Sequence, residues 1–219
     1  MIILIGGEKG GTGKSTIATN LAALVASSGG DVLLVDTDPQ GSASEWAGIR
    51  EDSNKAPITV IQKRGKIARD ILDLSERFDT VIIDAGGRDS IELRQAMGVA
   101  DVMFTPLQAS QFDIATLATL EEVYSLVDAT RGVSLPIYAF INRASPNPLV
   151  NEYKEAQAIV GEYDCFRLCE TVIRDRITFR KAASEGYGVH EMDRLDTKAT
   201  YEISNLFKEV MSHAHEKIT

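Results

Sequence analysis

The chain has 219 residues, of which 44% are hydrophobic, 25% are charged and two are cysteines. These values exclude a disordered, collagen-like or disulfide-stapled protein, and they favour a single domain over residues 1–219 in a reducing, cytoplasmic compartment. The longest apolar run, residues 21–26, is far shorter than the roughly 20 residues of a membrane span. Because 32 acidic residues outnumber 23 basic ones, the net charge is −9 and any contact with nucleic acid has to be local.

Short apolar runs recur along the chain and predict buried parallel strands. They are rich in β-branched residues and lack the alternation of apolar and polar residues that a half-exposed strand shows. The runs occupy residues 2–5, 32–35, 81–83, 102–104 and 137–141, and a sixth candidate at 58–61 is expected nearer a sheet edge.

Longer segments with helical periodicity separate these runs. They cover residues 15–28, 67–77, 90–99, 114–130, 150–162 and 197–213. Within 114–127, for example, apolar residues recur at steps of three and four and so share one helix face. The steady alternation of strand and helix predicts an α/β fold, a mainly parallel twisted sheet with helices on both faces.

The most informative segment, residues 6–16 (GGEKGGTGKST), joins the first expected strand to the first expected helix. Glycines let successive N–H groups point at one anion, and the helix N-terminus adds partial positive charge. Lys14 would then reach the β- and γ-phosphates of a nucleotide, and Ser15 would bind Mg²⁺. The strict pattern GxxxxGKS/T is missed by one position, because its first glycine falls at Glu8. The alternative is a glycine-rich turn that only caps a helix.

A second lysine stands at the start of residues 9–15 (KGGTGKS), and the segments 35–41 (VDTDPQG), 81–84 (VIID) and 100–106 (ADVMFTP) follow. They resemble the deviant Walker A motif, the second acidic motif, the Walker B strand and the next strand of the ParA/MinD family of P-loop ATPases. The likeness extends more weakly to the C-terminus, and DPQG points to the ParA partition branch. It implies a fold of the P-loop NTPase type, ATP and Mg²⁺ as cofactors, and hydrolysis of ATP to ADP and phosphate.

The resemblance implies three catalytic residues, Lys9, Lys14 and Asp38. In this family ATP joins two protomers face to face, so Lys9 of one protomer would reach the phosphates held by the other and stabilise the charge that develops there. A solvated loop lysine is the alternative for Lys9. Asp38 follows a buried strand at its carboxyl end and would position the attacking water.

Further candidates would hold the metal and the base. Asp36 and Asp84 each end an apolar run and, together with Ser15, would hold Mg²⁺ through its waters, although such aspartates often only cap a helix. Asn142 lies where family members recognise adenine, with ordinary turn chemistry as the alternative. The expected nucleotide-binding residues are Gly10, Gly11, Thr12, Gly13, Lys14, Ser15, Thr16 and Asn142.

Two basic clusters, residues 63–69 and 174–181, stand out from the acidic background. ParA-type ATPases use basic residues toward the C-terminus to hold double-stranded DNA non-specifically when dimeric, so the second cluster is the stronger candidate. Arg176 and Arg180 are four residues apart and are expected to share a helix face. The DNA-binding candidates are Arg174, Arg176, Arg180 and Lys181; a solvated helix face is the alternative for both clusters.

Other features favour structure over chemistry. Cys165 and Cys169 lack the further cysteines of an iron–sulfur site and are expected to be buried thiols at an apolar strand. Residues 213–215 (HAH) are expected to fray. Residues 202–219 have one apolar face but carry three glutamates, so packing onto the domain is favoured over docking onto a membrane.

Together these features predict a ParA-like ATPase that hydrolyses MgATP slowly, forms a homodimer with ATP and binds DNA non-specifically. It would be cytoplasmic, associated with the nucleoid when ATP is bound, and would partition plasmid or chromosomal DNA through a centromere-binding adaptor protein. In one alternative the same cycle positions a protein cargo, such as a microcompartment or a chemotaxis cluster. A metabolic P-loop ligase is a weaker alternative, since Lys9 and the segment DPQ count against it.

Overall fold

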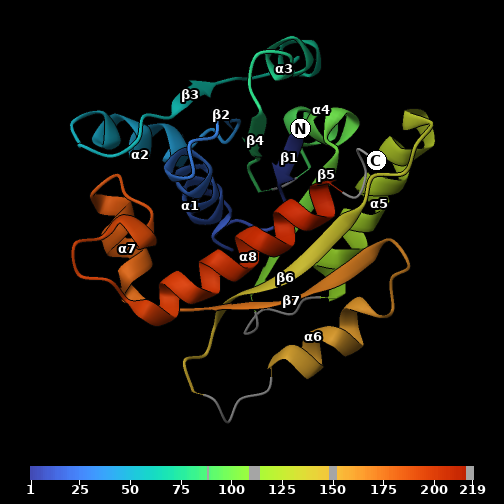
Figure 1. Ribbon diagram of the computed structural model, residues 1–219. Coiled ribbons are helices and arrows are strands. Elements are labelled where there is room, and N and C mark those ends of the chain that lie inside the picture. The colour runs from blue at the N-terminus through green and yellow to red at the C-terminus, as the bar shows by residue number, and fades with distance from the viewer. Residues whose placement is uncertain (88, 109–113, 148–151, 216–219) are drawn as a thin grey trace.

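The computed structural model describes residues 1–87, 89–108, 114–147 and 152–215 (Figure 1). Its strands are β1 (Ile2–Ile5), β2 (Val32–Asp36), β3 (Thr59–Gln62), β4 (Thr80–Asp84), β5 (Val102–Gln108), β6 (Ile137–Ala144) and β7 (Phe166–Arg174). Its helices are α1 (Lys14–Ser27), α2 (Ser42–Glu51), α3 (Ala68–Ser75), α4 (Ile91–Val99), α5 (Ile114–Arg131), α6 (Glu152–Val160), α7 (Ile177–Ser184) and α8 (Thr197–His215), with a short 3₁₀ turn at Val189–Glu191.

The strands form one sheet in the order β3-β2-β4-β1-β5-β6-β7, and every described pairing is parallel. The predicted fold class is therefore confirmed, including the edge position of β3. The short helix α2 was not predicted, and α7 was expected only through the helix face assigned to Arg176 and Arg180. The remaining helices lie within a few residues of their expected positions, because their apolar periodicity is strong while their ends depend on local capping.

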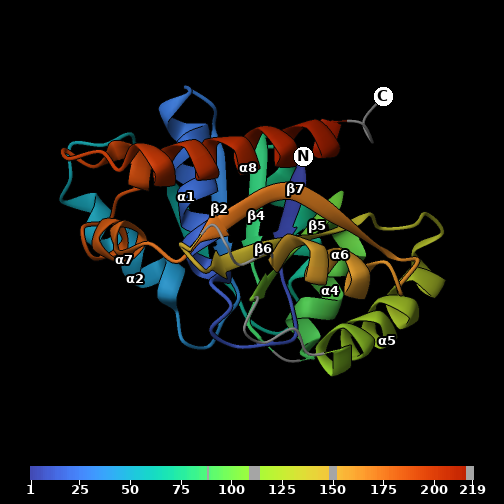
Figure 2. The same ribbon diagram turned by 90° about the horizontal axis from the view of Figure 1, so that it is seen from below.

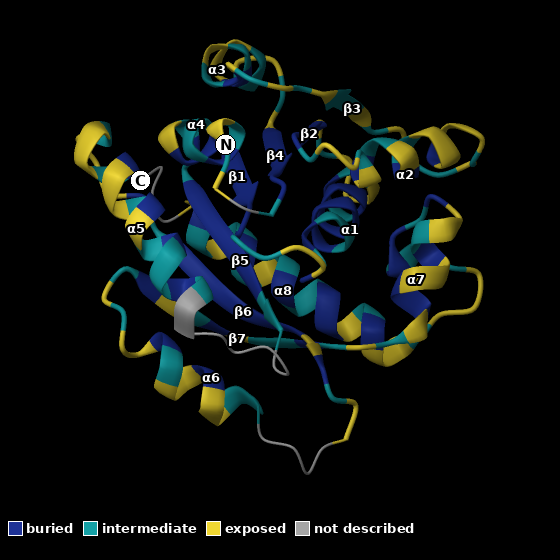
Figure 3. Ribbon diagram, turned by 180° about the vertical axis from the view of Figure 1, so that it is seen from behind, coloured by how far each residue is buried: buried dark blue, intermediate teal, exposed yellow. Residues whose placement is uncertain are grey.

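Each face of the sheet carries its own hydrophobic core. Alternate strand residues such as Ile3, Leu34 and Phe140 pack with α1, α2, α7 and α8 on one face. Their neighbours, such as Leu33 and Ile83, pack with α3, α4 and α5 on the other. Figure 2 shows α1 and α8 on the side of the sheet opposite α4 and α5, and Figure 3 shows the central strands and α1 buried between the helical layers. This double cover accounts for the unbroken apolar runs of the strands.

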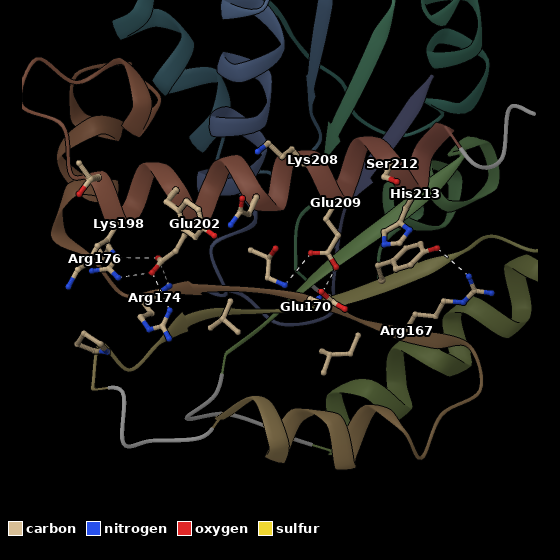
Figure 4. Close-up of a pocket in the computed structure, with 18 residues that line it drawn as sticks. Arg167, Glu170, Arg174, Arg176, Lys198, Glu202, Lys208, Glu209, Ser212 and His213 are labelled. Carbon is tan, nitrogen blue, oxygen red and sulfur yellow. Dashed lines mark hydrogen bonds and ion pairs between the residues drawn. The ribbon is translucent and has the colours of Figure 1, made fainter.

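Strand β7 forms the second edge of the sheet and is irregular. Its pairing with β6 shifts register, so that three residues, 169–171, stand opposite Phe140 alone. The Glu209 carboxylate of α8 accepts the N–H groups of Glu170 (2.7 Å) and Thr171 (3.1 Å). The Glu202 carboxylate accepts the N–H of Arg174 at 3.1 Å (Figure 4). Side chains of α8 thus bind main-chain donors that no neighbouring strand takes up.

Helix α8 packs along the domain, as predicted, with Ile203, Leu206 and Val210 buried. The expected fraying is wrong for His213, whose ring stacks on Tyr138 with 4.0 Å between ring centroids. Within the described part of the chain, no helix combines the length and hydrophobicity needed to cross a membrane.

The two cysteines differ in environment. Cys169 is fully buried in β7, as predicted, whereas Cys165 precedes the strand and is only half-buried. Burial raises the pKa of both thiols, that of Cys165 to about 11. Both side chains are therefore protonated and unreactive near neutral pH.

Candidate nucleotide site

The glycine-rich loop, residues 6–13, connects the carboxyl end of the central strand β1 to α1. Gly11 and Gly13 adopt φ angles of 79° and 94°, a region that favours glycine. A Cβ atom at Gly13 would also lie 2.3 Å from Nδ2 of Asn142, which donates a 2.7 Å hydrogen bond to the carbonyl of Thr12. The loop thus has the left-handed backbone conformations that an anion-binding loop requires, and the hydrogen bond from Asn142 fixes the position of Thr12.

The N-terminus of α1 is open to a ligand. Its N-cap, Gly13, provides no side-chain hydrogen bond, and the first turn contains no acidic residue. Lys14 is buried, and its Nζ donates to the carbonyl of Lys9 at 2.7 Å. Burial lowers the pKa of Lys14, against the attraction of Asp84, Asp38 and Glu8. Free helix N–H groups and a buried ammonium together form a site suited to phosphate.

Asp84, at the end of β4, is fully buried, and neither of its carboxylate oxygens has a hydrogen-bond partner in the described structure. Burial raises the pKa of Asp84 to about 7, and the nearby Ser15 hydroxyl and Lys14 ammonium only partly oppose this rise. The Ser15 hydroxyl is close enough to lower the pKa but lacks the geometry of a full hydrogen bond. An unpaired buried carboxylate of this kind is costly unless a cation or proton joins it.

These donors fit Mg²⁺, which prefers hard oxygen ligands and keeps several waters. Asp84 offers two oxygens without partners, and Ser15 stands beside it at the start of α1. In the described residues, no three His, Cys, Asp or Glu side chains converge closely enough to hold a metal by themselves. Phosphate oxygens and waters would therefore have to complete the coordination shell.

Asp36 has a different environment, because its carboxylate is already engaged by the start of α2. Its Oδ2 accepts hydrogen bonds from the N–H and hydroxyl of Ser44, both at 2.8 Å, and its Oδ1 accepts from the N–H of Asp38 at 3.0 Å. The helix-capping alternative therefore describes what Asp36 does in this structure. Any contact with Mg²⁺ would be through water, as the sequence analysis expects.

Asp38 lies in the loop between β2 and α2, within the electrostatic reach of Lys14 and Asp84. Its Oδ1 accepts a 2.9 Å hydrogen bond from the N–H of Gln40, and Arg64 donates to its carbonyl. A Cβ at Gly86 would lie 3.3 Å from the Asp38 carboxylate carbon. Asp38 is thus held against the loop that follows β4, beside the phosphate loop.

The loop after β4 rests directly on the glycine-rich loop. A Cβ at Gly87 would stand 2.7 Å from the N atom of Gly10 and 2.9 Å from the carbonyl carbon of Lys9, so only glycine fits there. The carboxyl ends of β1, β2 and β4 therefore bring Lys9, Lys14 and Asp38 together at the same end of the strands. Asp36 and Asp84 lie at this end as well. Open parallel sheets bind ligands at this end of their strands.

Glu8 is a residue of this site that the sequence analysis treated only as a break in the motif. Its Oε2 atom is buried without a hydrogen-bond partner in the described structure, and its charge acts on Lys14. The charged side chain within a glycine-rich loop was the available signal. Glu8 adds negative charge around Lys14 and strengthens the need for a cation in the site.

A small pocket lies beside Thr16, in the first turn of α1. It is lined by Thr16, Asn142, Arg143, Arg174, Asp175, Arg176, Phe179 and Arg180. Arg143 is held at a φ of 56°, and strain of this kind gathers at functional sites. Three residues expected to bind DNA, Arg174, Arg176 and Arg180, therefore share a pocket with Thr16 and Asn142 of the candidate nucleotide site.

The ion pairs of the basic residues explain this placement. Arg174 and Arg176 both pair with Glu202 of α8, at 3.2 and 2.6 Å, and Figure 4 shows their side chains turned toward it. Arg180 pairs with Asp175 at 2.9 Å. The expected helix face shared by Arg176 and Arg180 is wrong, because Arg176 is extended (φ −120°, ψ 135°) and α7 begins after it. Each of these three arginines is thus paired with a carboxylate of the domain.

Comparison with known proteins agrees with this geometry. A family model described as the CobQ/CobB/MinD/ParA nucleotide binding domain matches residues 3–189. The chain belongs to this family. Among relatives of this ParA/MinD-family chain, the carboxysome distribution protein A of Gloeobacter kilaueensis is 31% identical over 86% of the chain and 83% of its own length.

Other relatives of the ParA/MinD-family chain carry related names. The carboxysome distribution protein A of Halothiobacillus neapolitanus is 27% identical over 93% of each chain. The chromosome partitioning protein ParA of Myxococcus xanthus is 30% identical, but the alignment spans only 58% of each chain.

Solved structures share the fold of the ParA/MinD-family chain. Apo McdA of Cyanothece superposes with a TM-score of 0.72 at 22% identity, covering 97% of this chain and 98% of its own. MinD of Pyrococcus horikoshii with Mg-ADP gives 0.72 at 21% identity, with coverages of 99% and 98%. A plasmid partition protein of Borrelia burgdorferi bound to AMPPNP gives 0.66 at 20% identity, with coverages of 96% and 97%. These likenesses, all below 25% identity, concern the fold alone.

Proposed function

We propose that this chain is an ATPase that binds MgATP at the glycine-rich loop and uses slow hydrolysis to partition or position a cargo. The observation that carries this proposal is the pairing of an uncapped α1 N-terminus with buried Lys14 and the unpartnered Asp84 carboxylate. That combination suits a triphosphate and its Mg²⁺ and leaves costly unpaired charges without them. Relatives solved with Mg-ADP and AMPPNP support the same ligand class.

Within this proposal each residue has a separate task. Lys14 binds the phosphates, Ser15 and Asp84 hold the metal, and Asp38 orients the attacking water. Bound Mg²⁺ supplies charge neutralisation at the phosphates. Asn142 and the pocket beside it would take the nucleoside, consistent with its position next to Thr16.

We propose further that ATP joins two copies of the chain and that Lys9 acts in trans on the nucleotide of the partner. The side chain of Lys9 is half-buried at the rim of the site, and its carbonyl already binds Lys14 and Thr12. A second ammonium near the γ-phosphate would stabilise developing charge and make hydrolysis depend on dimerisation.

Sedimentation velocity tests this proposal directly. A non-hydrolysable ATP analogue with Mg²⁺ is expected to convert a monomer into a dimer, whereas ADP is expected to leave a monomer. Lys9→Gln should retain ATP binding within about threefold but lose the dimer and at least about 90% of turnover, because the trans ammonium is missing. Lys66→Gln, a change of the same kind at an exposed loop lysine, is the control. Normal turnover by the Lys9→Gln protein would contradict action in trans.

For the cargo, we propose DNA, partitioned through a centromere-binding adaptor, with the ATP-bound dimer holding duplex DNA on the nucleoid non-specifically. The match to a chromosome partitioning ParA supports this cargo. A protein cargo reached through an adaptor is the second candidate, because the carboxysome distribution relatives align over 86% and 93% of the chain, against 58% for that ParA.

A charge-reversal pair tests DNA binding by α7. Arg180 and Lys181 are exposed on this helix, whereas Arg174 and Arg176 form ion pairs with Glu202. Arg180→Glu with Lys181→Glu is expected to weaken DNA binding at least tenfold in gel shifts at low salt, because phosphate contacts dominate such binding. ATP affinity should stay within twofold. The matched control is Lys66→Glu with Arg69→Glu, the same change on the exposed part of the first cluster. Loss of binding by the control pair alone would assign DNA to that cluster instead.

A further inference from the structure

Arg50, in the last turn of α2, is a buried arginine with every N–H donor engaged. Its side chain is 4% exposed. Nε and Nη2 donate to the carbonyl of Ala56 at 3.1 and 2.8 Å, and Nη1 donates to the carbonyl of Gly186 at 3.0 Å. Nη1 and Nη2 also bind the two carboxylate oxygens of Glu191, both at 2.8 Å. These five bonds use the full donor set of a guanidinium.

Glu191 belongs to the segment 186–191, which lies within the connection between α7 and α8. Its carboxylate is 6% exposed and also accepts the N–H of Gly188 at 2.7 Å. Burial raises the pKa of Glu191, but the hydrogen bonds from Arg50 and Gly188 outweigh burial and hold it below its usual range. The carboxylate is therefore charged, and the contact is a bidentate ion pair.

The main chain at Gly186 packs directly against the main chain at Arg50. Gly186 has a φ of 68°, and a Cβ there would lie 2.5 Å from the N atom and 2.7 Å from the Cα of Arg50. Trp46 of α2, buried beneath the guanidinium, donates its indole N–H to the carbonyl of Tyr187 at 3.2 Å. The C-terminal half of α2 is thus fixed to this segment by side chains and by backbone contact.

The other end of α2 reaches the nucleotide site. Ser44, in its first turn, donates both its N–H and its hydroxyl to Asp36, which in turn accepts the N–H of Asp38. With ten residues, α2 spans about 15 Å as a rigid unit. One short helix therefore connects the loop that carries Asp38 to the segment between α7 and α8.

Stability alone is a weak account of the Arg50–Glu191 pair. A buried ion pair contributes little net stability relative to apolar residues of similar size, whereas it specifies one arrangement of the elements that it joins. Because all five N–H donors of Arg50 have a fixed partner, the ion pair allows α2 neither to slide along its helix axis nor to rotate about that axis.

We propose that the Arg50–Glu191 ion pair is a positioning device that holds α2, and through Ser44 and Asp36 the loop 36–41, in the arrangement needed for hydrolysis. The inference rests on the proposed ATPase function. Arg50 and Glu191 touch no substrate; they act through α2 on Asp38. Changes in the segment 186–191, which lies between α7 and α8, are thereby coupled to the nucleotide site.

Arg50→Lys tests the device, because lysine keeps the charge and loses the planar fork. In the ligand-free protein, hydrogen–deuterium exchange of residues 36–48 is expected to speed up at least fivefold, while residues 6–16 stay unchanged. The kcat for ATP hydrolysis is expected to fall at least tenfold, with KM and ATP affinity within twofold, since Lys14 and the glycine-rich loop are untouched. Glu191→Gln should reproduce the pattern, and it serves if Arg50→Lys does not fold.

Arg131→Lys is the matched control. Arg131 also donates to several main-chain carbonyls, those of Met97, Ala100 and Val133, but it lies at the opposite end of the strands. Its replacement is expected to lower the melting temperature while leaving kcat and the exchange of residues 36–48 unchanged. An equal loss of kcat in this control would reduce the Arg50 effect to general destabilisation and overturn the proposal.

The two readouts separate the inference from the proposed function. Unchanged exchange of residues 36–48 in both Arg50→Lys and Glu191→Gln would overturn the positioning role, whatever the chemistry of the site. If the unmodified chain does not hydrolyse ATP, the proposed function fails. The same exchange comparison then still decides whether the ion pair controls the loop.

Discussion

Lys14→Ala is expected to reduce ATP affinity at least about a hundredfold, roughly 3 kcal/mol. The Nζ atom of Lys14 is buried beside the uncapped N-terminus of α1, so a nucleotide would exchange its contact with the carbonyl of Lys9 for contacts with phosphate. A hydrogen bond between charged groups in such surroundings contributes about 1.5–3 kcal/mol, and a lysine can make two. Titration calorimetry with MgATP measures the change.

Circular dichroism should show that the Lys14→Ala protein is folded, because the substitution removes a buried charge and leaves the apolar core unchanged. Lys66→Ala, at an exposed loop lysine, is the control and should bind ATP normally. Undiminished affinity in the Lys14→Ala protein would remove the assignment of residues 6–16 as a phosphate loop.

Asp84→Asn is expected to stabilise the ligand-free protein at pH 8 while abolishing its stabilisation by MgATP. The folded-state pKa of Asp84 is raised from 3.8 to about 7, so between these values the folded chain holds a proton that the unfolded chain has released. Stability therefore falls as pH rises through this window. Between pH 5 and pH 8 the loss is about 3 kcal/mol, from two units at about 1.4 kcal/mol each. Because asparagine does not titrate, the Asp84→Asn protein does not lose this stability as the pH rises.

Thermal unfolding at pH 5 and pH 8 measures this effect. The melting temperature of the variant relative to the unmodified protein should rise by several degrees between the two pH values. Asp52→Asn, at an exposed aspartate, should show a constant difference. Stabilisation of the Asp84→Asn protein by MgATP equal to that of the unmodified chain would contradict the metal assignment, since bound ligand stabilises in proportion to its affinity.

The order of strands and helices could be predicted from the sequence, because the central strands and helices have a clear pattern of apolar residues. Strands β1, β2 and β4 are buried on both faces and read as unbroken apolar runs. The glycine-rich loop was predictable because its glycines and Lys14 lie close together, within residues 6–14, directly after the first strand. Helix α2 was missed because only two of its residues, Trp46 and Ile49, are large and apolar, so it shows no clear apolar period. Helix α7 was expected only from the spacing of Arg176 and Arg180, and it begins after Arg176.

Ion pairs between residues far apart in the chain could not be predicted from the sequence. The sequence makes Arg174 and Arg176 candidates for binding DNA, but their partner Glu202 is contributed by α8, more than 25 residues away. For Asp36 the sequence leaves a metal role and helix capping both open, and it does not show which side chain the carboxylate meets; the structure places Ser44 there. Charge counted along a chain overstates the charge available at a surface, since pairing depends on tertiary contacts.

The carboxylates of Glu202 and Glu209 have a consequence for self-association. An unprotected outer strand can recruit a strand from another copy, which leads to open-ended polymers. Here the amides of residues 170, 171 and 174 are already occupied, so a newcomer would first have to expel two anions from their bonds. Growth by sheet extension past β7 is thereby disfavoured.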